Sequence, residues 1–209
     1  ITVRGNVFSE IGKSNTTNRS FSWALDLSDN ERSLVENNYF LHQPWFTNSY
    51  AINISASTMR DLNVRGNTFY NINGSALIAD SQTGWSNVRV SDNRFLAPPS
   101  NACLIRHSGD SGAVSYDNNK YSNFGEFCVN GQRQTIAQWR TNSGEGNAQV
   151  FSGTFVDPNR TLTTYAASLG YASVESFLAA TQTLSRFDWR HSLTASAVNE
   201  YIKSGFSLR

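Results

Sequence analysis

The sequence predicts an all-β solenoid, a right-handed single-stranded parallel β-helix of about six coils, closed by a small C-terminal α-helical cap. Three observations lead to this prediction. A six-residue template recurs along the chain, apolar residues alternate with polar ones before each copy, and a helical pattern replaces the strands near the end. We therefore expect two parts, with β-helix coils over residues 1–156 and a helical cap over residues 157–209.

The recurring template is an apolar residue, two polar or turn-forming residues, Asn, any residue and an aromatic residue. Five copies follow it closely and the sixth is degenerate: 3–8, 35–40, 64–69, 90–95, 116–121 and 150–155. From Asn6 to Asn119 the asparagine advances by 32, 29, 26 and 26 residues, and Gly153 takes its place in the sixth copy. Such a period is typical of a solenoid, because one unit cannot bury its apolar face until neighbouring units stack on it.

Each repeat predicts a strand, a bend and further strands. Apolar residues alternate with polar ones before the bend, as at Leu62 and Val64, which indicates a strand with one buried face. Gly, Asn or Asp beside the template asparagine tolerates left-handed backbone angles and marks the bend. After the aromatic residue, a second apolar run predicts another strand in each repeat, at 23–27, 51–54, 76–79, 103–105 and 127–129.

Stacking of the coils predicts three columns of equivalent residues, one strand spacing or roughly 4.8 Å apart. We expect an apolar column, an aromatic column and a buried asparagine column whose side chains bond turn amides of neighbouring coils. Their members are Val3, Val35, Val64, Val90, Tyr116 and Val150; Phe8, Phe40, Phe69, Phe95, Tyr121 and Phe155; and Asn38, Asn67, Asn93 and Asn119. Cys103 and Cys128 follow their asparagines by ten and nine residues, so we expect them to be adjacent in the core, with free thiols favoured over a disulfide.

Helical periodicity predicts three helices in the tail, at 161–169, 174–184 and 195–204. Ser173 is the expected N-cap of the second helix, and Gly170 and Gly205 are the expected stops of the first and third. Such a tail would cover the strand edges and open core of the last coil. The amino end shows no comparable cap, so we expect missing N-terminal coils or a partner chain to abut Ile1–Val3.

Composition excludes several functional classes. The chain has 17 basic and 16 acidic residues, a net charge of +1 and only three lysines, which argues against a nucleic-acid partner. No apolar stretch approaches the roughly 18 residues of a membrane span. No zinc signature or phosphate loop is present, and we expect no metal and no cofactor. Few charges and 12% aromatic residues are typical of an extracellular β-protein, so we expect a secreted or cell-surface location.

The Val-x-Gly-Asn-x-Phe turns at 3–8 and 64–69 resemble those of right-handed parallel β-helix proteins of the pectin-lyase-like superfamily, and the Ala-rich tail resembles the ends of secreted bacterial β-helix proteins. The resemblance covers about residues 1–156. The superfamily includes polysaccharide lyases, glycoside hydrolases, epimerases, phage tailspikes and adhesins, so it implies the fold and leaves the activity open. We expect the C-terminal portion of a secreted carbohydrate-active protein that binds or cleaves an extracellular polysaccharide. The alternatives are a non-catalytic surface or adhesion module and a trimeric phage receptor-binding spike.

Candidate catalytic residues lie in and after the second strands. The resemblance to lyases implies proton abstraction beside a uronate carboxylate, which needs a base and a cation that stabilises the developing charge. Arg106 and His107 could supply these, and Asp80 lies about one coil away. A hydrolase would instead need paired carboxylates, for which Asp26 and Asp80 are two coils apart. Whether the chain is an enzyme stays open.

Loop tryptophans are the candidate substrate-binding residues. Trp45, Trp85 and Trp139 fall outside the inward columns, and exposed aromatic faces suit the C–H faces of sugar rings. The alternative is that they fold against the coil wall. The residues that follow the apolar column alternate in charge and predict a neutralising surface ladder of modest energy: Arg4, Glu36, Arg65, Ser91 and Asp117.

Overall fold

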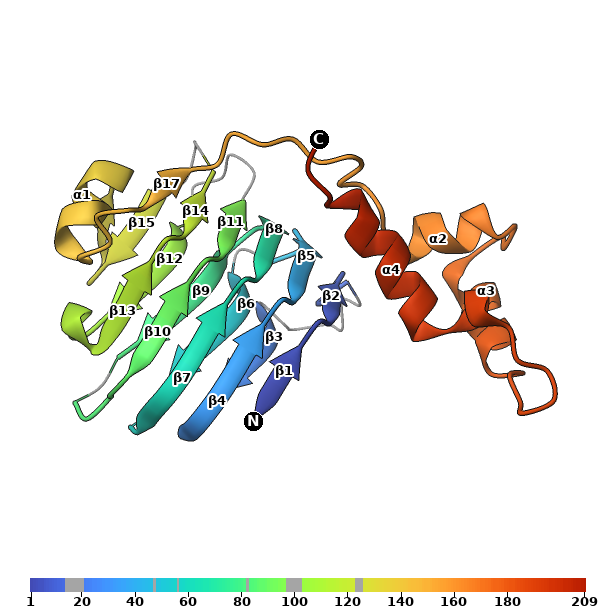
Figure 1. Cartoon of the computed structure of the whole chain (residues 1–209), viewed down its shortest axis with the longest axis horizontal. Helices are drawn as coiled ribbons and strands as arrows, with labels where there is room; N and C mark the ends of the chain where they lie inside the picture. Colours follow the sequence, from blue (N-terminus) through green and yellow to red (C-terminus); the bar gives the residue numbers. More distant parts are fainter. Residues whose placement is uncertain (14–20, 47, 56, 82, 97–102, 123–125) are drawn as a thin grey trace. The chain divides into compact units, whose positions relative to one another are not determined.

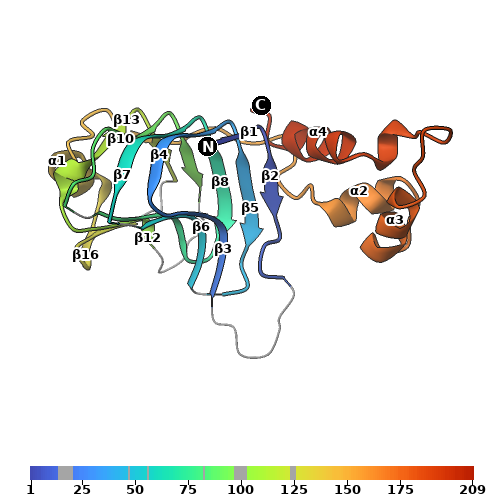
Figure 2. The same cartoon turned by 90° about the horizontal axis from the view of Figure 1, so that it is seen from below.

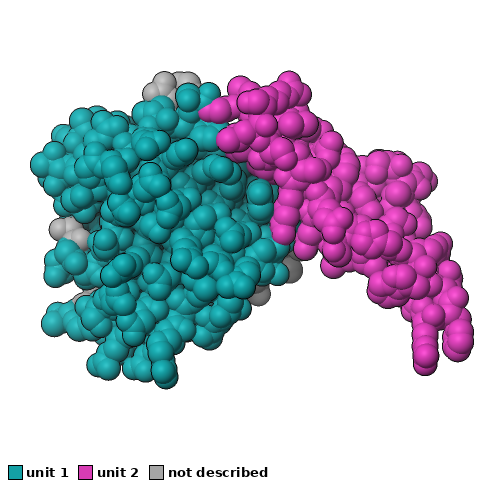
Figure 3. All heavy atoms as spheres, viewed as in Figure 1, with its two compact units in different colours: residues 1–152 teal, residues 153–209 magenta. Residues whose placement is uncertain are grey.

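The computed structural model is a parallel β-solenoid with short helices toward its C-terminus, as the sequence predicts (Figure 1). The structure describes residues 1–13, 21–46, 48–55, 57–81, 83–96, 103–122 and 126–209. The chain divides into two compact units, residues 1–152 and 153–209, coloured separately in Figure 3. No helix in the described ranges is long and apolar enough to cross a membrane.

The first unit is built from three sheets, in which strands of neighbouring coils lie side by side (Figures 1 and 2). The first sheet contains, in spatial order, β1 (Thr2–Arg4), β4 (Asn30–Glu36), β7 (Met59–Arg65), β10 (Val88–Ser91) and β13 (Val114–Asp117). The second contains β2 (Val7–Ser9), β5 (Tyr39–Gln43), β8 (Thr68–Ile72), β11 (Arg94–Leu96), β14 (Lys120–Tyr121) and β17 (Gln149–Val150). The third contains β3 (Phe21–Leu27), β6 (Asn48–Ser55), β9 (Ser75–Asp80), β12 (Cys103–Ser108), β15 (Glu126–Val129) and β16 (Gln132–Gln134).

From β1 to β15, successive strands belong to successive sheets, and all strand pairs are parallel except β15 with β16. The first sheet holds one strand from each of five coils, so four full turns separate β1 from β13. About six coils were expected, which is too many, because the sixth copy of the template supplies only β17. A short 3-10 helix, η1 (Ser111–Ala113), precedes β13.

The predicted columns are confirmed over five coils. Val3, Val35, Val64, Val90 and Tyr116 are register partners in the first sheet. In the second sheet the aromatic rings stack from Phe8 to Tyr121 with centroid separations of 4.8, 5.0, 4.7 and 5.3 Å. These separations match the spacing of paired strands, so the backbone pairing and the ring stack reinforce one another.

The asparagine ladder is also confirmed. The Oδ1 atom of Asn93 accepts both the backbone N–H and the side-chain amide of Asn67, at 2.9 and 3.0 Å. Its own side-chain amide donates to the Val64 carbonyl at 2.9 Å. The same pattern joins the other template asparagines, and four of them are fully buried: Asn38, Asn67, Asn93 and Asn119.

The sixth copy does not continue the columns as expected. Val150 pairs with Tyr121 in the second sheet, not with Tyr116 in the first. Phe155 belongs to the second unit and contacts Phe206, with ring centroids 5.1 Å apart. The place of the next asparagine is taken by Glu145, whose Oε1 accepts the backbone and side-chain N–H groups of Asn119 at 2.9 and 2.8 Å. A carboxylate ends the ladder because it accepts both bonds and needs no further acceptor.

The cysteine prediction was right about adjacency and wrong about oxidation state. Cys103 and Cys128 lie on neighbouring strands β12 and β15 with a Cα separation of 5.6 Å, and they form a disulfide. Parallel coils bring β-carbons of adjacent strands within disulfide range, which spacing along the chain could not distinguish from two packed thiols.

The C-terminal end of the solenoid core is covered by a helix that the sequence analysis did not anticipate, α1 (Ile136–Asn142). Its Trp139 is fully buried, stacks on Phe127 at 4.5 Å and meets Tyr116 edge to face at 4.8 Å. Thr135 and Gln138 form a capping box at its start. The core of the last coil is therefore covered by a helix of the first unit itself.

The second unit contains the three expected helices, α2 (Leu162–Ser168), α3 (Val174–Thr181) and α4 (Ala195–Gly205), with the 3-10 helix η2 (His191–Leu193) before α4. Ser173 caps α3 as predicted, and Gly170 adopts a φ of +84° just after α2. Gly205 is the last residue of α4 and not a left-handed stop. A β-carbon there would collide with the Asp157 carbonyl, so close packing explains the glycine.

Candidate functional site

Three residues in left-handed backbone conformation lie at the same level of successive coils in the first sheet. Arg32, Asp61 and Asn87 have φ values of +53°, +52° and +54°. Asp and Asn adopt this conformation readily, whereas for Arg it costs roughly 1–2 kcal/mol. Neighbouring side chains Ser33, Leu62 and Val88 point inward and are buried. The three residues therefore bend the strands while the core pattern is kept.

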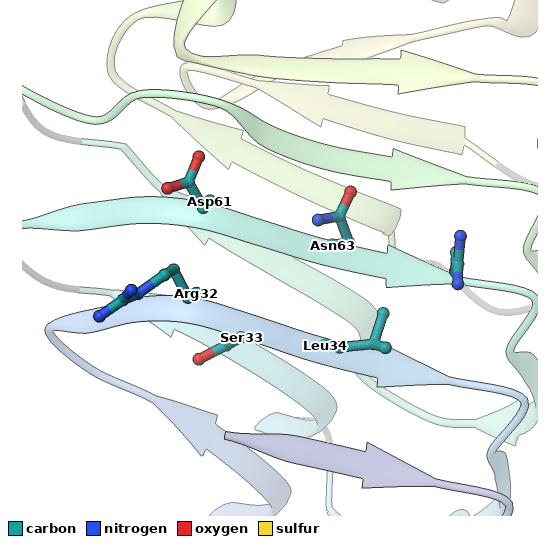
Figure 4. Close-up of a pocket in the computed structure, with 6 residues that line it drawn as sticks. Arg32, Ser33, Leu34, Asp61 and Asn63 are labelled. Atoms are coloured by element: carbon teal, nitrogen blue, oxygen red, sulfur yellow. The ribbon is translucent and has the colours of Figure 1, made fainter.

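Where the strands bend, the outer face of the first sheet holds an open groove of about 370 Å³. We call it the first-sheet groove. It is lined by Arg32, Ser33 and Leu34 from β4 and by Asp61, Asn63 and Arg65 from β7. In Figure 4, Asp61 and Asn63 project from the same side of β7, and Arg32 extends from the adjacent strand β4. Five of the six lining residues have polar or charged side chains. Ser33 is buried, and the other four can bond a ligand from the outside.

A chain of hydrogen bonds holds the carboxylate of the groove in place. The Nε atom of Arg89 donates to Asn87 Oδ1 at 3.0 Å, and Asn87 Nδ2 donates to Asp61 Oδ1 at 2.5 Å. No described residue bonds the second carboxylate oxygen of Asp61 through its side chain. Asp61 therefore presents an oriented acceptor to the groove.

Beside the groove lies a charge cluster around Glu36, as expected from the alternating charges of the predicted surface ladder. Arg65 donates to Glu36 Oε2 through Nε at 2.8 Å and Nη2 at 2.7 Å, and Arg4 forms an ion pair with the other oxygen. The hydrogen bond from Arg65, helped by Arg4, lowers the pKa of Glu36 against the opposing effect of burial. Arg65 is thus largely neutralised, while Arg32 forms no ion pair with any residue that the structure describes.

The predicted pair Arg106 and His107 is divided between the two faces of β12. Arg106 is exposed, whereas His107 is buried, because successive strand residues point to opposite faces. The ring Nε2 of His107 lies 3.0 Å from the Asp110 carbonyl, which can only accept, so Nε2 carries the proton. Nδ1 then accepts from the Tyr116 hydroxyl at 2.9 Å. Burial lowers the pKa of His107, so it is a neutral core residue and not a partner of Arg106 at one surface.

Asp80 and Arg106 do share the outer face of the third sheet. Asp80 is the register partner of Ser108, and Arg106 of Ile78, which places the two charged residues diagonally on neighbouring strands. The Arg106 guanidinium lies 5.9 Å from the centroid of the Tyr50 ring. The Asp26 and Asp80 pair is divided by Asn53, which donates to Asp26 Oδ1 at 2.8 Å. This face remains the second candidate surface.

Two of the three candidate tryptophans are core residues. Trp139 is fully buried under α1 and donates from Nε1 to Glu145 Oε2 at 2.7 Å. Trp85 is buried and belongs to the main apolar core of the solenoid. The expectation that these two face a ligand is therefore wrong, since a large ring gains more from filling the coil wall than from exposure. Trp45 is exposed and stays a candidate.

Sequence reasoning missed Arg32, Asp61, Asn63 and Asn87. A signal was present, since Arg32, Asp61 and Asn87 each stand three residues before a valine of the apolar column. Asp and Asn at a periodic position are typical of left-handed bends. Because the equivalent residue in the preceding coil is Arg32, these three positions were not recognised as equivalent.

The first-sheet groove combines guanidinium donors, an amide and an oriented carboxylate, which together suit hydroxyl and carboxylate groups of a polar ligand. No group of three His, Cys, Asp or Glu residues in the described ranges is placed to hold a metal. Comparison of the chain with known protein families, curated proteins and solved structures found no match. The candidate site therefore rests on the geometry of its own residues.

Proposed function

We propose that this chain binds an extracellular polysaccharide along the outer face of its first sheet. The observation that carries the proposal is the stack of three left-handed residues, which opens a groove of about 370 Å³ beside Asn63. Equivalent polar positions repeat at the strand spacing, so the surface offers periodic contacts to a linear repeating polymer. Membership of the pectin-lyase-like superfamily is part of the same proposal, supported by the confirmed template columns.

Binding without cleavage is favoured over catalysis. A glycoside hydrolase needs two carboxyl groups around the scissile bond, and the groove lining contains one, Asp61. The nearby Glu36 is engaged by two arginines, which stabilise its ionised form and oppose a role as proton donor. For a lyase, the histidine proposed as base is buried on the inner face of β12. The alternative is a lyase or hydrolase activity of the whole protein, and the test described below includes an assay for cleavage products.

Secretion is the matching proposal for localisation. The Cys103–Cys128 disulfide supports it, because disulfides persist in oxidising compartments and are rare in the cytosol. The low content of charged residues, 16%, agrees with it.

The test is affinity electrophoresis of the full chain through gels that contain uronate-rich or neutral polysaccharides. Asp61→Asn keeps side-chain size, and Arg32→Gln replaces the guanidinium with a shorter polar group. Each removes one charge, and Asn also tolerates the left-handed backbone at position 61. We expect either variant to weaken binding by tenfold or more, about 1.4 kcal/mol. Arg106→Gln is the matched control, since it removes an exposed arginine from the third sheet.

Loss of binding in Arg106→Gln, with Arg32→Gln unchanged, would move the site to the third sheet around Asp80. If new reducing ends or unsaturated uronates are released from any polysaccharide, the chain is an enzyme, and the proposal of binding without cleavage is wrong. If the polysaccharide slows all three variants as much as it slows wild type on every gel, the proposed groove is wrong.

A further inference from the structure

The strands of the first sheet carry five exposed arginines in the described part of the chain: Arg4, Arg32, Arg60, Arg65 and Arg89. Two of them, Arg32 and Arg65, line the first-sheet groove. A guanidinium can bind a carboxylate through two parallel hydrogen bonds, so it is a natural partner for the acidic group of a sugar. The number of arginines that are free for this role therefore limits the number of acidic groups that the groove can bind.

Glu36 withholds Arg65 from this role. The Oε2 atom of Glu36 accepts from Nε and Nη2 of Arg65, at 2.8 and 2.7 Å, which fills one bidentate edge of the guanidinium. Arg4 binds the other oxygen, so the carboxylate is held from both neighbouring strands. A ligand carboxylate that approached Arg65 would meet the negative charge of Glu36 at the same guanidinium, and this repulsion opposes binding.

The arginines outside the groove lining are also engaged. Arg60 pairs with Glu31 at 3.7 Å, and Arg89 donates from Nε to Asn87 Oδ1 at 3.0 Å. Arg32 differs from both, because it lines the groove and has a strained left-handed backbone, a feature that is frequent at ligand-binding sites. Among the residues that the structure describes, the groove lining therefore offers one uncommitted positive charge, that of Arg32.

We propose that the first-sheet groove selects polysaccharides whose acidic groups are sparse, and that Glu36 is the residue that sets this specificity. The inference rests on the polysaccharide binding proposed above and names the class of polymer. Arg32 binds one carboxylate, while Asn63 and Asp61 bond hydroxyl groups of the uncharged sugars beside it. A polymer with an acid on every sugar gains little from the additional acids, because Glu36 already occupies Arg65 and Asp61 repels them.

Galacturonan chains of one length and graded methyl esterification test the proposal, because esterification removes the charge of a carboxylate and leaves the ring hydroxyls in place. The chains are fully esterified, sparsely acidic with isolated free carboxylates, or fully de-esterified. Binding of the full-length chain to each is measured by biolayer interferometry at one salt concentration, since surface electrostatics depend on ionic strength.

The variants separate the local effect of Glu36 from a change in net charge. Glu36→Gln keeps the shape of the side chain and removes its charge, and a double variant adds Arg65→Gln to it. Glu126→Gln is the matched control, because it makes the same change of charge at an exposed carboxylate of β15 that pairs with Arg133. Circular dichroism melting of each variant reports whether the solenoid remains folded.

We expect wild type to bind the sparsely acidic chain about tenfold more tightly than the fully esterified one, through Arg32. Complete de-esterification should then add less than about threefold, because no second guanidinium is free. Glu36→Gln should bind the fully de-esterified chain about tenfold more tightly than wild type does, and the added Arg65→Gln should abolish this gain. Glu126→Gln should behave as wild type.

The proposal is wrong if wild type binds the fully de-esterified chain about tenfold more tightly than the sparsely acidic one, or binds the sparsely acidic and fully esterified chains equally. It is also wrong if Glu36→Gln shows no gain or if Glu126→Gln shows the same gain. If Glu36→Gln melts early, Arg65→Gln alone decides, since it must keep the preference for the sparsely acidic chain. Absence of wild-type binding to all three chains would overturn this inference, whereas the proposed function stands if the affinity gels show binding to another polysaccharide.

Discussion

Replacement of Glu145 by Gln is expected to destabilise the solenoid, although the two side chains have nearly the same shape. Glu145 is 1% exposed and accepts four hydrogen bonds. Its Oε1 binds the two N–H groups of Asn119, at 2.9 and 2.8 Å, and its Oε2 binds Tyr121 Oη at 2.6 Å and Trp139 Nε1 at 2.7 Å. It therefore joins the end of the asparagine ladder to the helix that covers the core.

The magnitude follows from the donors that an amide cannot satisfy. If the Gln oxygen faces Asn119, its NH₂ group faces Tyr121 and Trp139. The tyrosine hydroxyl can rotate and accept, but the indole N–H can only donate and is left unpaired. The flipped amide leaves both Asn119 donors unpaired instead. One buried unpaired donor costs about 1–3 kcal/mol, and the loss of charge assistance adds to this, while release of a buried charge offsets part. We expect a net loss of about 2 kcal/mol.

Urea unfolding followed by tryptophan fluorescence measures this loss, with the free energy obtained by linear extrapolation. Glu126→Gln is the control, because Glu126 is an exposed carboxylate of the last coil that pairs with Arg133, and its loss should change stability by less than about 1 kcal/mol. If Glu145→Gln unfolds within about 0.5 kcal/mol of wild type, the carboxylate is not what closes the ladder.

Three further predictions concern the core. Asn93→Ala should lower the free energy of unfolding by about 1–3 kcal/mol, since it leaves the N–H groups of Asn67 unpaired, and an unchanged urea midpoint would contradict the buried ladder. Replacement of Cys103 and Cys128 by Ser should cost about 3 kcal/mol, as expected for a link across 25 residues, and a thiol titration of the unfolded wild type that finds two free thiols would refute the disulfide. Burial lowers the pKa of His107 in the folded state, so the unfolded state takes up the proton first and stability should fall as pH drops below about 6.5. His107→Gln should flatten that part of the stability–pH curve, and an unchanged slope would show that another group titrates there.

The repeat could be predicted from sequence because like residues occupy like positions in every coil. Val64 and Val90, or Phe69 and Phe95, are visible as equivalents without coordinates, and their register is as expected. The end of the repeat could not be predicted in this way. Glu145 performs the task of an asparagine with different chemistry, and Trp139 completes the core from a helix, so neither resembles the template.

The candidate site was harder to predict for a related reason. Side chains alternate between the two faces of β12, so Arg106 and its neighbour His107 lie on opposite faces. The sequence does not indicate which of these two polar residues faces solvent. The first-sheet groove depends on backbone angles at Arg32 and Asp61, and arginine gives no sequence signal for a left-handed bend. The periodic position was visible only through Asp61 and Asn87, and the arginine at the same position in the preceding coil hid the column.

The asparagine ladder has a direction, and this direction makes the solenoid modular. From Asn38 onward, each template asparagine accepts through Oδ1 from the asparagine of the preceding coil and donates to the side-chain acceptor of the following coil. Its side-chain amide also donates to the valine carbonyl of the preceding coil, so each coil presents the same chemistry on its two sides as its neighbours do. Removing or adding a whole 26-residue period, such as that from Asn67 to Asn93, would join equivalent donors to equivalent acceptors. The length of such a protein can therefore change in steps of one coil without a new core, provided that an acceptor-only group stands at the end of the ladder.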